Sequence, residues 1–392
     1  MSLGQTAAVS GETEGHRVRV VGWTLARLGL LAVLAAPPVR RWSLGQGLAW
    51  VYLALLACAC SLAATPAVRF YAVWRGVLDQ PAARKVHRRA TPLLGGAAVY
   101  AAFAVTVLYN FNFSLQLKGV AVGATLIVAL GLMDDVLDLP AVLKLLGQVA
   151  AAGLAIGYHV ILSVVPSGVP GAIWLDVLLT VLWFVTVTNA VQFLDGMDGL
   201  ASGLGVVAAL FFGITALQTN QKYLMYLSAA LLGACLGFLP YNFRPGRGAL
   251  IFLGDGGSSF IGFTLAGLAV MGEWAKDNPV VALLTPMLIL GVPLFDIAFV
   301  GLSRITSGEV HSLGGWLAYT GKDHVHHRFA DLGMTQTQSV LLILFISLTL
   351  GLSAMLLKDA LPHEAALLLG QAVCVLAIVA ILETVGRGKS AR

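Results

Sequence analysis

Eleven long apolar segments constrain the fold of this chain more than any other feature of its sequence. They lie near residues 47–68, 93–109, 118–133, 144–163, 172–191, 199–217, 223–241, 257–272, 279–303, 338–357 and 364–384. A helix of about 20 apolar residues spans the hydrocarbon core of a bilayer. Charged residues make up 11% of the 392 residues, against roughly 25% in a typical soluble domain. The pattern excludes a soluble enzyme and predicts an all-α, polytopic integral membrane protein with about eleven transmembrane helices.

The domain organisation follows from the same segments. Short loops separate them, so residues 47–386 are predicted to form a single transmembrane domain, followed by a short basic cytoplasmic tail at 387–392. Residues 1–46 form an N-terminal extension. Within it, the weaker apolar stretch 17–40 contains Arg27 and ends in Pro37-Pro38. We interpret this stretch as an interfacial helix or as a twelfth span.

Positive charge is distributed unequally between the two sets of loops. With eleven spans, the loops after odd-numbered segments and the C-terminal tail carry 15 Lys and Arg residues, whereas the other loops carry four, namely Lys118, Lys222, Lys276 and Lys358. Cytoplasmic loops are enriched in Lys and Arg. The odd-numbered side, which also holds the polar clusters, is therefore predicted to face the cytoplasm. Ionisable groups at membrane level are costly and usually functional, so the active site is expected on that face.

An acidic cluster, Asp134, Asp135 and Asp138, ends the third segment. Asp134 and Asp138 share a face if the helix continues through them. Three carboxylates together repel one another strongly, so we expect a cation among them, and Lys144 is the only one nearby in sequence. Neighbouring carboxylates also raise one another's pKa, which suits a proton acceptor. The cluster therefore predicts catalytic residues or a nearby metal rather than a solvated helix end.

Two further clusters predict a site for a diphosphate and a metal. Asn189, Gln192, Asp195 and Asp198 lie at two glycine-containing turns between apolar segments, where an irregular backbone is tolerated if it lines a polar cavity. The run Gly254-Asp255-Gly256 opens the eighth segment. Unpaired N–H groups at a helix start favour phosphate, whereas Asp255 repels phosphate unless a divalent cation such as Mg²⁺ bridges them.

Two basic loops supply candidate phosphate ligands. The first carries Lys85, His87 and Thr91, and the second carries His324, His326 and His327. A His-x-His-His run can bind zinc, although no cysteine or spaced fourth ligand accompanies it here. Binding of an anionic phosphate by histidines beside Lys and Arg is the favoured interpretation.

Taken in order, these motifs resemble the polyprenyl-phosphate N-acetylhexosamine-1-phosphate transferase superfamily. The resemblance covers about residues 69–333. It rests on the Asp79-x-Pro, Thr91-Pro, Asp134-Asp135-x-x-Asp138, Asn189-x5-Asp195, Gly254-Asp255 and His324-x-His326-His327 motifs. It implies a bacterial inner-membrane enzyme whose substrates are a UDP-N-acetylhexosamine and undecaprenyl phosphate, and whose cofactor is Mg²⁺, with Mn²⁺ as a substitute. Membrane lipid is the expected environment, a homodimer is left open, and no nucleic-acid partner is expected.

The resemblance also implies roles for individual residues. Asp255 and Gln192 would hold Mg²⁺, and Gln192 stands where the family usually has Asn. Phe252 would stack on uracil, and the remaining substrate-binding residues would be Asn189, Asp195, Asp198, Asn242 and Arg304, together with the basic-loop residues above.

Other functions remain open at this point. The peptidoglycan branch of the superfamily makes lipid I, but Asp138 and the His-x-His-His run resemble the N-acetylglucosamine branch instead. GlcNAc is therefore the expected sugar, with GalNAc or a deoxy-aminosugar as alternatives. A transporter is the competing class, although its ionisable groups would lie near the midplane, with inverted repeats. A non-catalytic scaffold would bind the UDP-sugar without turnover.

Overall fold

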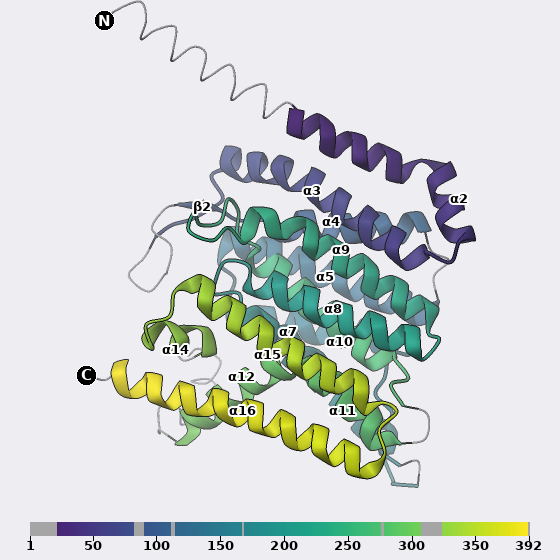
Figure 1. The fold of residues 1–392 in the computed structure, drawn as a ribbon, viewed down its shortest axis with the longest axis vertical. Helices are drawn as coiled ribbons and strands as arrows, with labels where there is room; N and C mark the ends of the chain where they lie inside the picture. Colours follow the sequence, from purple (N-terminus) through teal and green to yellow (C-terminus); the bar gives the residue numbers. More distant parts are fainter. Residues whose placement is uncertain are drawn as a thin grey trace, which may run out of the picture.

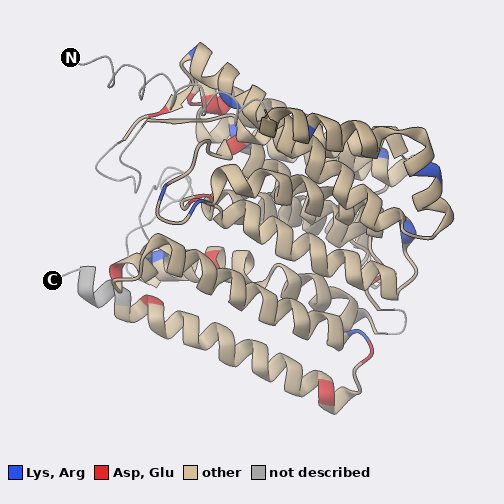
Figure 2. Cartoon of the chain, turned by 45° about the horizontal axis from the view of Figure 1, so that its top comes forward, with Lys and Arg blue, Asp and Glu red and all other residues tan. Residues whose placement is uncertain are grey.

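The computed structural model describes residues 22–81, 90–110, 114–166, 168–275, 278–306 and 324–390. Long helices lie side by side with roughly parallel axes (Figure 1). Most Lys, Arg, Asp and Glu positions of these residues lie near the two ends of the helices, and the lengths between them hold few charged residues (Figure 2). This arrangement confirms an all-α, polytopic integral membrane protein.

The described elements are mostly helices. They comprise the helix Gly22–Ala35, α2 (Pro37–Gly45), α3 (Ala49–Arg75), α4 (Gly95–Asn110), α5 (Leu115–Leu137), α6 (Ala141–Gly157), α7 (Ala172–Phe193), α8 (Leu200–Gln218), α9 (Lys222–Asn242), α10 (Gly254–Met271), α11 (Pro279–Ile289), α12 (Gly291–Thr306), α14 (Val325–Asp331), α15 (Gln336–Leu357) and α16 (Pro362–Ser390). Two short strands, β1 (Leu78–Asp79) and β2 (Thr91–Pro92), pair antiparallel, with Leu78 opposite Pro92.

Each of the eleven expected segments contains a helix, but the number of spans is not confirmed as eleven. Among the described residues, seven helices are long and apolar enough to cross a membrane, or up to nine if each of two bent pairs counts as one span. The helices α4 and α6 are apolar but shorter. The segment 279–303 is broken into α11 and α12, which meet at 85°. Pro286, Gly291 and Pro293 lie around this break, and such residues interrupt helices.

The N-terminal extension contributes a second bent pair. The helix Gly22–Ala35 and α2 meet at 57° and together pass the same test of length and apolarity. The first of them lies alongside α3 (Figure 1), where the Tyr52 hydroxyl donates to the Leu34 carbonyl. Arg27 lies over the Tyr241 ring of α9, 5.4 Å from its centroid. These contacts pack the N-terminal helix against the bundle. Its assignment as an interfacial helix or a further span, and the division of the chain at residue 46, stay predictions.

The helix α10 is the core of the bundle, because nearly all of its residues are buried against α4, α5, α7 and α8. Glycines bring its first turn very close to two neighbours. A Cβ added to Gly131 of α5 would lie 2.5 Å from Gly256 Cα, and one added to Gly96 of α4 would lie 2.1 Å from Gly257 N. Small residues of this kind let helices pack closely in membranes. The start of α10, which carries Asp255, is therefore fixed between α4 and α5.

Candidate active site

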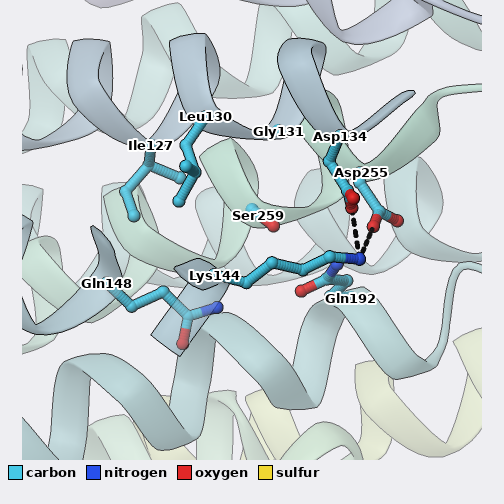
Figure 3. A pocket seen from close by; sticks show the side chains of 9 residues that line it. All are labelled: Ile127, Leu130, Gly131, Asp134, Lys144, Gln148, Gln192, Asp255 and Ser259. Carbon is cyan, nitrogen blue, oxygen red and sulfur yellow. Dashed lines mark hydrogen bonds and ion pairs between the residues drawn. The ribbon is translucent and has the colours of Figure 1, made fainter. Parts of the chain in front are cut away.

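Three charged side chains from three helices meet at the start of α10 (Figure 3). Lys144, near the start of α6, forms an ion pair with Asp134 in the last turn of α5. Its Nζ also lies 3.3 Å from Asp255 Oδ2. Lys144 is thus the cation expected among the acidic residues. Among the described residues, it is the only cation that lines the surrounding pocket, whose lining is Ile127, Leu130, Gly131, Asp134, Lys144, Gln148, Gln192, Asp255 and Ser259.

Asp135 lies beside this cluster but is held differently. Its two carboxylate oxygens accept hydrogen bonds from the backbone N–H groups of Asp255, at 2.8 Å, and Gly256, at 3.3 Å. The expectation that these N–H groups bind phosphate is therefore wrong, because a carboxylate of the protein occupies them. Asp135 closes the N-terminus of α10 and holds the backbone that carries Asp255. A catalytic role for Asp135 stays a prediction.

Asp138 does not share a helix face with Asp134. The helix α5 ends at Leu137, and Asp138 adopts a left-handed conformation with φ 53°. Its side chain is exposed, whereas Asp134 is buried and accepts a hydrogen bond from the Leu139 N–H at 2.7 Å. The expected shared face required a helix that continued, and the chain turns instead. The catalytic roles of Asp134 and Asp138 stay predictions.

The end of α7 supplies two amide side chains to the same region. Gln192 lines the pocket with Lys144 and Asp255 (Figure 3). One turn earlier, Asn189 Nδ2 donates to Gln148 Oε1 of α6 at 2.6 Å. These positions are three residues apart and lie on neighbouring parts of one helix face. The structure thus places the two predicted metal ligands, Gln192 and Asp255, in the same pocket.

Asp195, in the turn after α7, adds another carboxylate. Burial raises its pKa well above the ordinary value of 3.8, and the charges of Asp255, Asp135 and Asp198 raise it further. A backbone hydrogen bond from Gly254 acts in the opposite direction. Several acids therefore converge on one site, and added positive charge, whether from a basic side chain or a metal ion, would favour their ionised forms.

Asn242 connects the turn before α8 with the segment before α10. Its Oδ1 accepts from the Gly199 N–H at 2.8 Å and the Ser202 hydroxyl at 3.3 Å, and its Nδ2 donates to the Ile251 carbonyl at 3.1 Å. The side chain is buried. These contacts give Asn242 a structural role, and substrate binding by it stays a prediction.

Asp198 and Phe252 belong to the same set of connections. Asp198 Oδ2 accepts from the Ala249 N–H at 2.8 Å. The Phe252 N–H donates to the Pro92 carbonyl at 2.8 Å, and the Phe252 carbonyl accepts from the Gly95 N–H at 3.0 Å. The structure thus places Phe252 beside β2, which contains the predicted phosphate ligand Thr91. Direct contact of these residues with a substrate stays a prediction.

The histidine run 324–327, at the start of α14, packs against the turn after α7. The His324 and Phe193 rings lie 5.3 Å apart, centroid to centroid. His326 is 1% exposed, and a Cβ added to Gly196 would lie 2.2 Å from its Nε2. Burial lowers the pKa of His326 well below 6.5, and His327 and His324 lower it further. The histidine run therefore adjoins the turn that carries Asp195.

The remaining predicted substrate ligands are Lys85, His87 and Arg304. Lys85 and His87 lie outside the described residues, as does most of the stretch 305–323. Arg304 is buried near the end of α12. Their roles in substrate binding stay predictions.

The sequence motifs do not identify Gln148 or Asp296 as candidate site residues, and they assign Lys144 no role in the reaction. Lys144 and Gln148 are four residues apart in an otherwise apolar segment, so they share a helix face. Asp296 is a lone acid in another apolar segment. In each case the available signal was a polar side chain inside a membrane segment, which is costly unless it has a partner.

Comparison with known proteins places the chain among sugar-phosphate transferases. Residues 117–273 match the family model described as glycosyl transferase family 4. The chain is 34% identical over 303 residues to a probable undecaprenyl-phosphate N-acetylglucosaminyl 1-phosphate transferase of Bacillus subtilis, covering 76% of this chain and 81% of the relative. It is 34% identical over 360 residues to a decaprenyl-phosphate N-acetylglucosaminephosphotransferase of Mycolicibacterium smegmatis, covering 83% and 86%. A phospho-N-acetylmuramoyl-pentapeptide-transferase of Moorella thermoacetica is 40% identical over 180 residues, which is 44% of this chain and 56% of the relative.

Proposed function

Because the chain belongs to glycosyl transferase family 4, we propose that it transfers N-acetylglucosamine-1-phosphate from UDP-GlcNAc to undecaprenyl phosphate. The products are UMP and a polyprenyl-diphospho-sugar. The observation that carries the proposal is the meeting of Lys144, Asp134 and Asp255 in one pocket beside Gln192. A half-buried cation between acids suits a reaction that depends on positioning and charge neutralisation. The proposed setting is the bacterial inner membrane, with the site facing the cytoplasm.

The reaction exchanges one phosphorus–oxygen bond for another. An oxygen of the lipid phosphate bonds to the β-phosphorus of the donor, and the bond from that phosphorus to the bridging oxygen breaks. UMP leaves with the bonding electrons. Lys144 supplies fixed positive charge beside the diphosphate. Asp134, which lies in the pocket and contacts Lys144, is the proposed acceptor of the lipid-phosphate proton.

The donor set fits a magnesium ion shared with a substrate. Mg²⁺ is commonly held by one or two carboxylates, waters and substrate phosphates rather than by an all-protein cage. In the part of the chain that the structure describes, no three His, Cys, Asp or Glu side chains are grouped to hold a metal by themselves. Asp255, with Gln192 beside it, would hold the ion, which would neutralise diphosphate charge when bound.

A donor panel tests this proposal. Purified protein in detergent with undecaprenyl phosphate and Mg²⁺ is assayed for UMP release from UDP-GlcNAc, UDP-GalNAc and UDP-MurNAc-pentapeptide. We expect release from UDP-GlcNAc that stops when the lipid phosphate is omitted or the metal is chelated. Release only from UDP-MurNAc-pentapeptide would assign the chain to the reaction named for the Moorella relative. Flux of a UDP-sugar into proteoliposomes without UMP release would indicate a transporter.

A further inference from the structure

Asp296, in the second turn of α12, is a fully buried carboxylate that binds the start of the histidine run. It is 0% exposed and lies shortly after the break between α11 and α12. A buried carboxylate is costly unless its oxygens accept hydrogen bonds. Oδ1 accepts from the Val325 N–H at 2.7 Å, and Oδ2 lies 2.6 Å from His324 Nδ1. Asp296 therefore ties the broken helix to α14.

The contact with His324 determines which ring nitrogen carries hydrogen. A carboxylate oxygen at 2.6 Å requires Nδ1 to be the donor. Nε2 is then the ring nitrogen left for other partners, because a hydrogen bond to one ring nitrogen sets the tautomer at the other. The ring also packs against Phe193, and 12% of the His324 side chain is exposed. Its orientation is thus fixed on two sides while part of it remains accessible.

We propose that Asp296 is a positioning residue for the transferase reaction, which holds His324 in its Nδ1–H tautomer with Nε2 free for the substrate. This inference rests on the proposed function. Capping of α14 alone would require only an acceptor for the Val325 N–H. The bond to Nδ1 adds an orienting role of the kind that a carboxylate serves for histidine in other active sites.

The test compares two buried aspartates that each accept two hydrogen bonds. In Asp296→Asn, the amide oxygen can still accept from the Val325 N–H, but the NH₂ group faces Nδ1 and favours the Nε2–H tautomer. The matched control is Asp176→Asn in α7. Asp176 is also buried, but its Oδ1 accepts only backbone N–H groups, those of Val164 at 3.2 Å and Val165 at 3.1 Å.

Two readouts are measured on the full-length protein in detergent. UMP release from UDP-GlcNAc gives kcat/KM for each variant. ¹⁵N-histidine NMR, with the His324 signals assigned by their loss in His324→Gln, reports the tautomer directly. We expect kcat/KM to fall at least about tenfold in Asp296→Asn and to stay within about twofold in Asp176→Asn. Wild-type protein should show Nδ1–H at His324.

Equal activity of the two Asn variants, or an Nε2–H tautomer at His324 of wild-type protein, would overturn the inference. The NMR measurement needs no substrate, so absence of UMP release by wild-type protein would count against the proposed function alone. If Asp296→Asn fails to fold, the wild-type tautomer still decides between the two outcomes.

Discussion

Lys144 of α6 and Asp255 of α10 are 111 residues apart in sequence, and their charged groups meet at 3.3 Å. Asp134 of α5 completes the contact from a third helix. The glycine contact between α5 and α10 brings two of these helices together. The site is therefore a product of close helix packing as much as of the acidic motifs.

The first prediction concerns the charge of Lys144. Lys144→Met removes the cation and leaves Asp134 and Asp255 facing each other, so we expect kcat for UMP release to fall by at least about 100-fold. Lys118→Met is the matched control, because Lys118 is exposed at the opposite end of α5, and it should stay within about twofold. Equal activity of the two variants would show that the reaction does not need the charge of Lys144.

The second prediction separates two roles of Asp135. Asp135→Asn leaves one good acceptor for two N–H groups of α10, so we expect a stability loss of about 1 kcal/mol. Activity should fall with it, because Asp255 is carried by the same turn. Thermal unfolding in detergent and UMP release are measured together. A large loss of activity with unchanged unfolding would instead support Asp135 as a proton acceptor.

The third prediction concerns the contact between the α7–α8 turn and α14. In Gly196→Ala, the added Cβ would lie 2.2 Å from His326 Nε2, so the buried His326 ring or the turn beside it must shift. We expect at least about a tenfold loss of activity. Gly153→Ala in α6, where a Cβ meets nothing within 4 Å, should keep normal activity in the same UMP assay. Normal activity of Gly196→Ala would show that the placement of His326 does not matter.

The fourth prediction follows from the lowered pKa of His326. The folded state keeps this imidazole neutral, whereas the unfolded chain protonates it near pH 6.5. The unfolded state therefore binds more protons below that pH, and stability is lost as the pH falls. Thermal unfolding of wild-type protein and His326→Phe is compared at about pH 8 and pH 5.5. The loss of stability on acidification should be smaller in the variant, and an equal loss would contradict the pKa assignment.

The sequence predicted the fold class, because the length of an apolar segment is a local property of the chain. It also predicted that a cation must lie among the acids near Asp134. It failed at Asp135, whose partners are backbone groups 120 and 121 residues away. That contact depends on the close approach of Gly131 to Gly256, which spacing along a single chain does not reveal. Asp296 was missed for the same reason, because its partners lie 28 and 29 residues away.

Analysis of both products of one reaction tests the central claim most directly. Wild-type protein is incubated with UDP-GlcNAc, undecaprenyl phosphate and Mg²⁺, and UMP and the lipid product are quantified by mass spectrometry. We predict UMP and undecaprenyl-diphospho-GlcNAc in equal amounts. UMP without the lipid product, or UDP in place of UMP, would contradict transfer of the sugar phosphate.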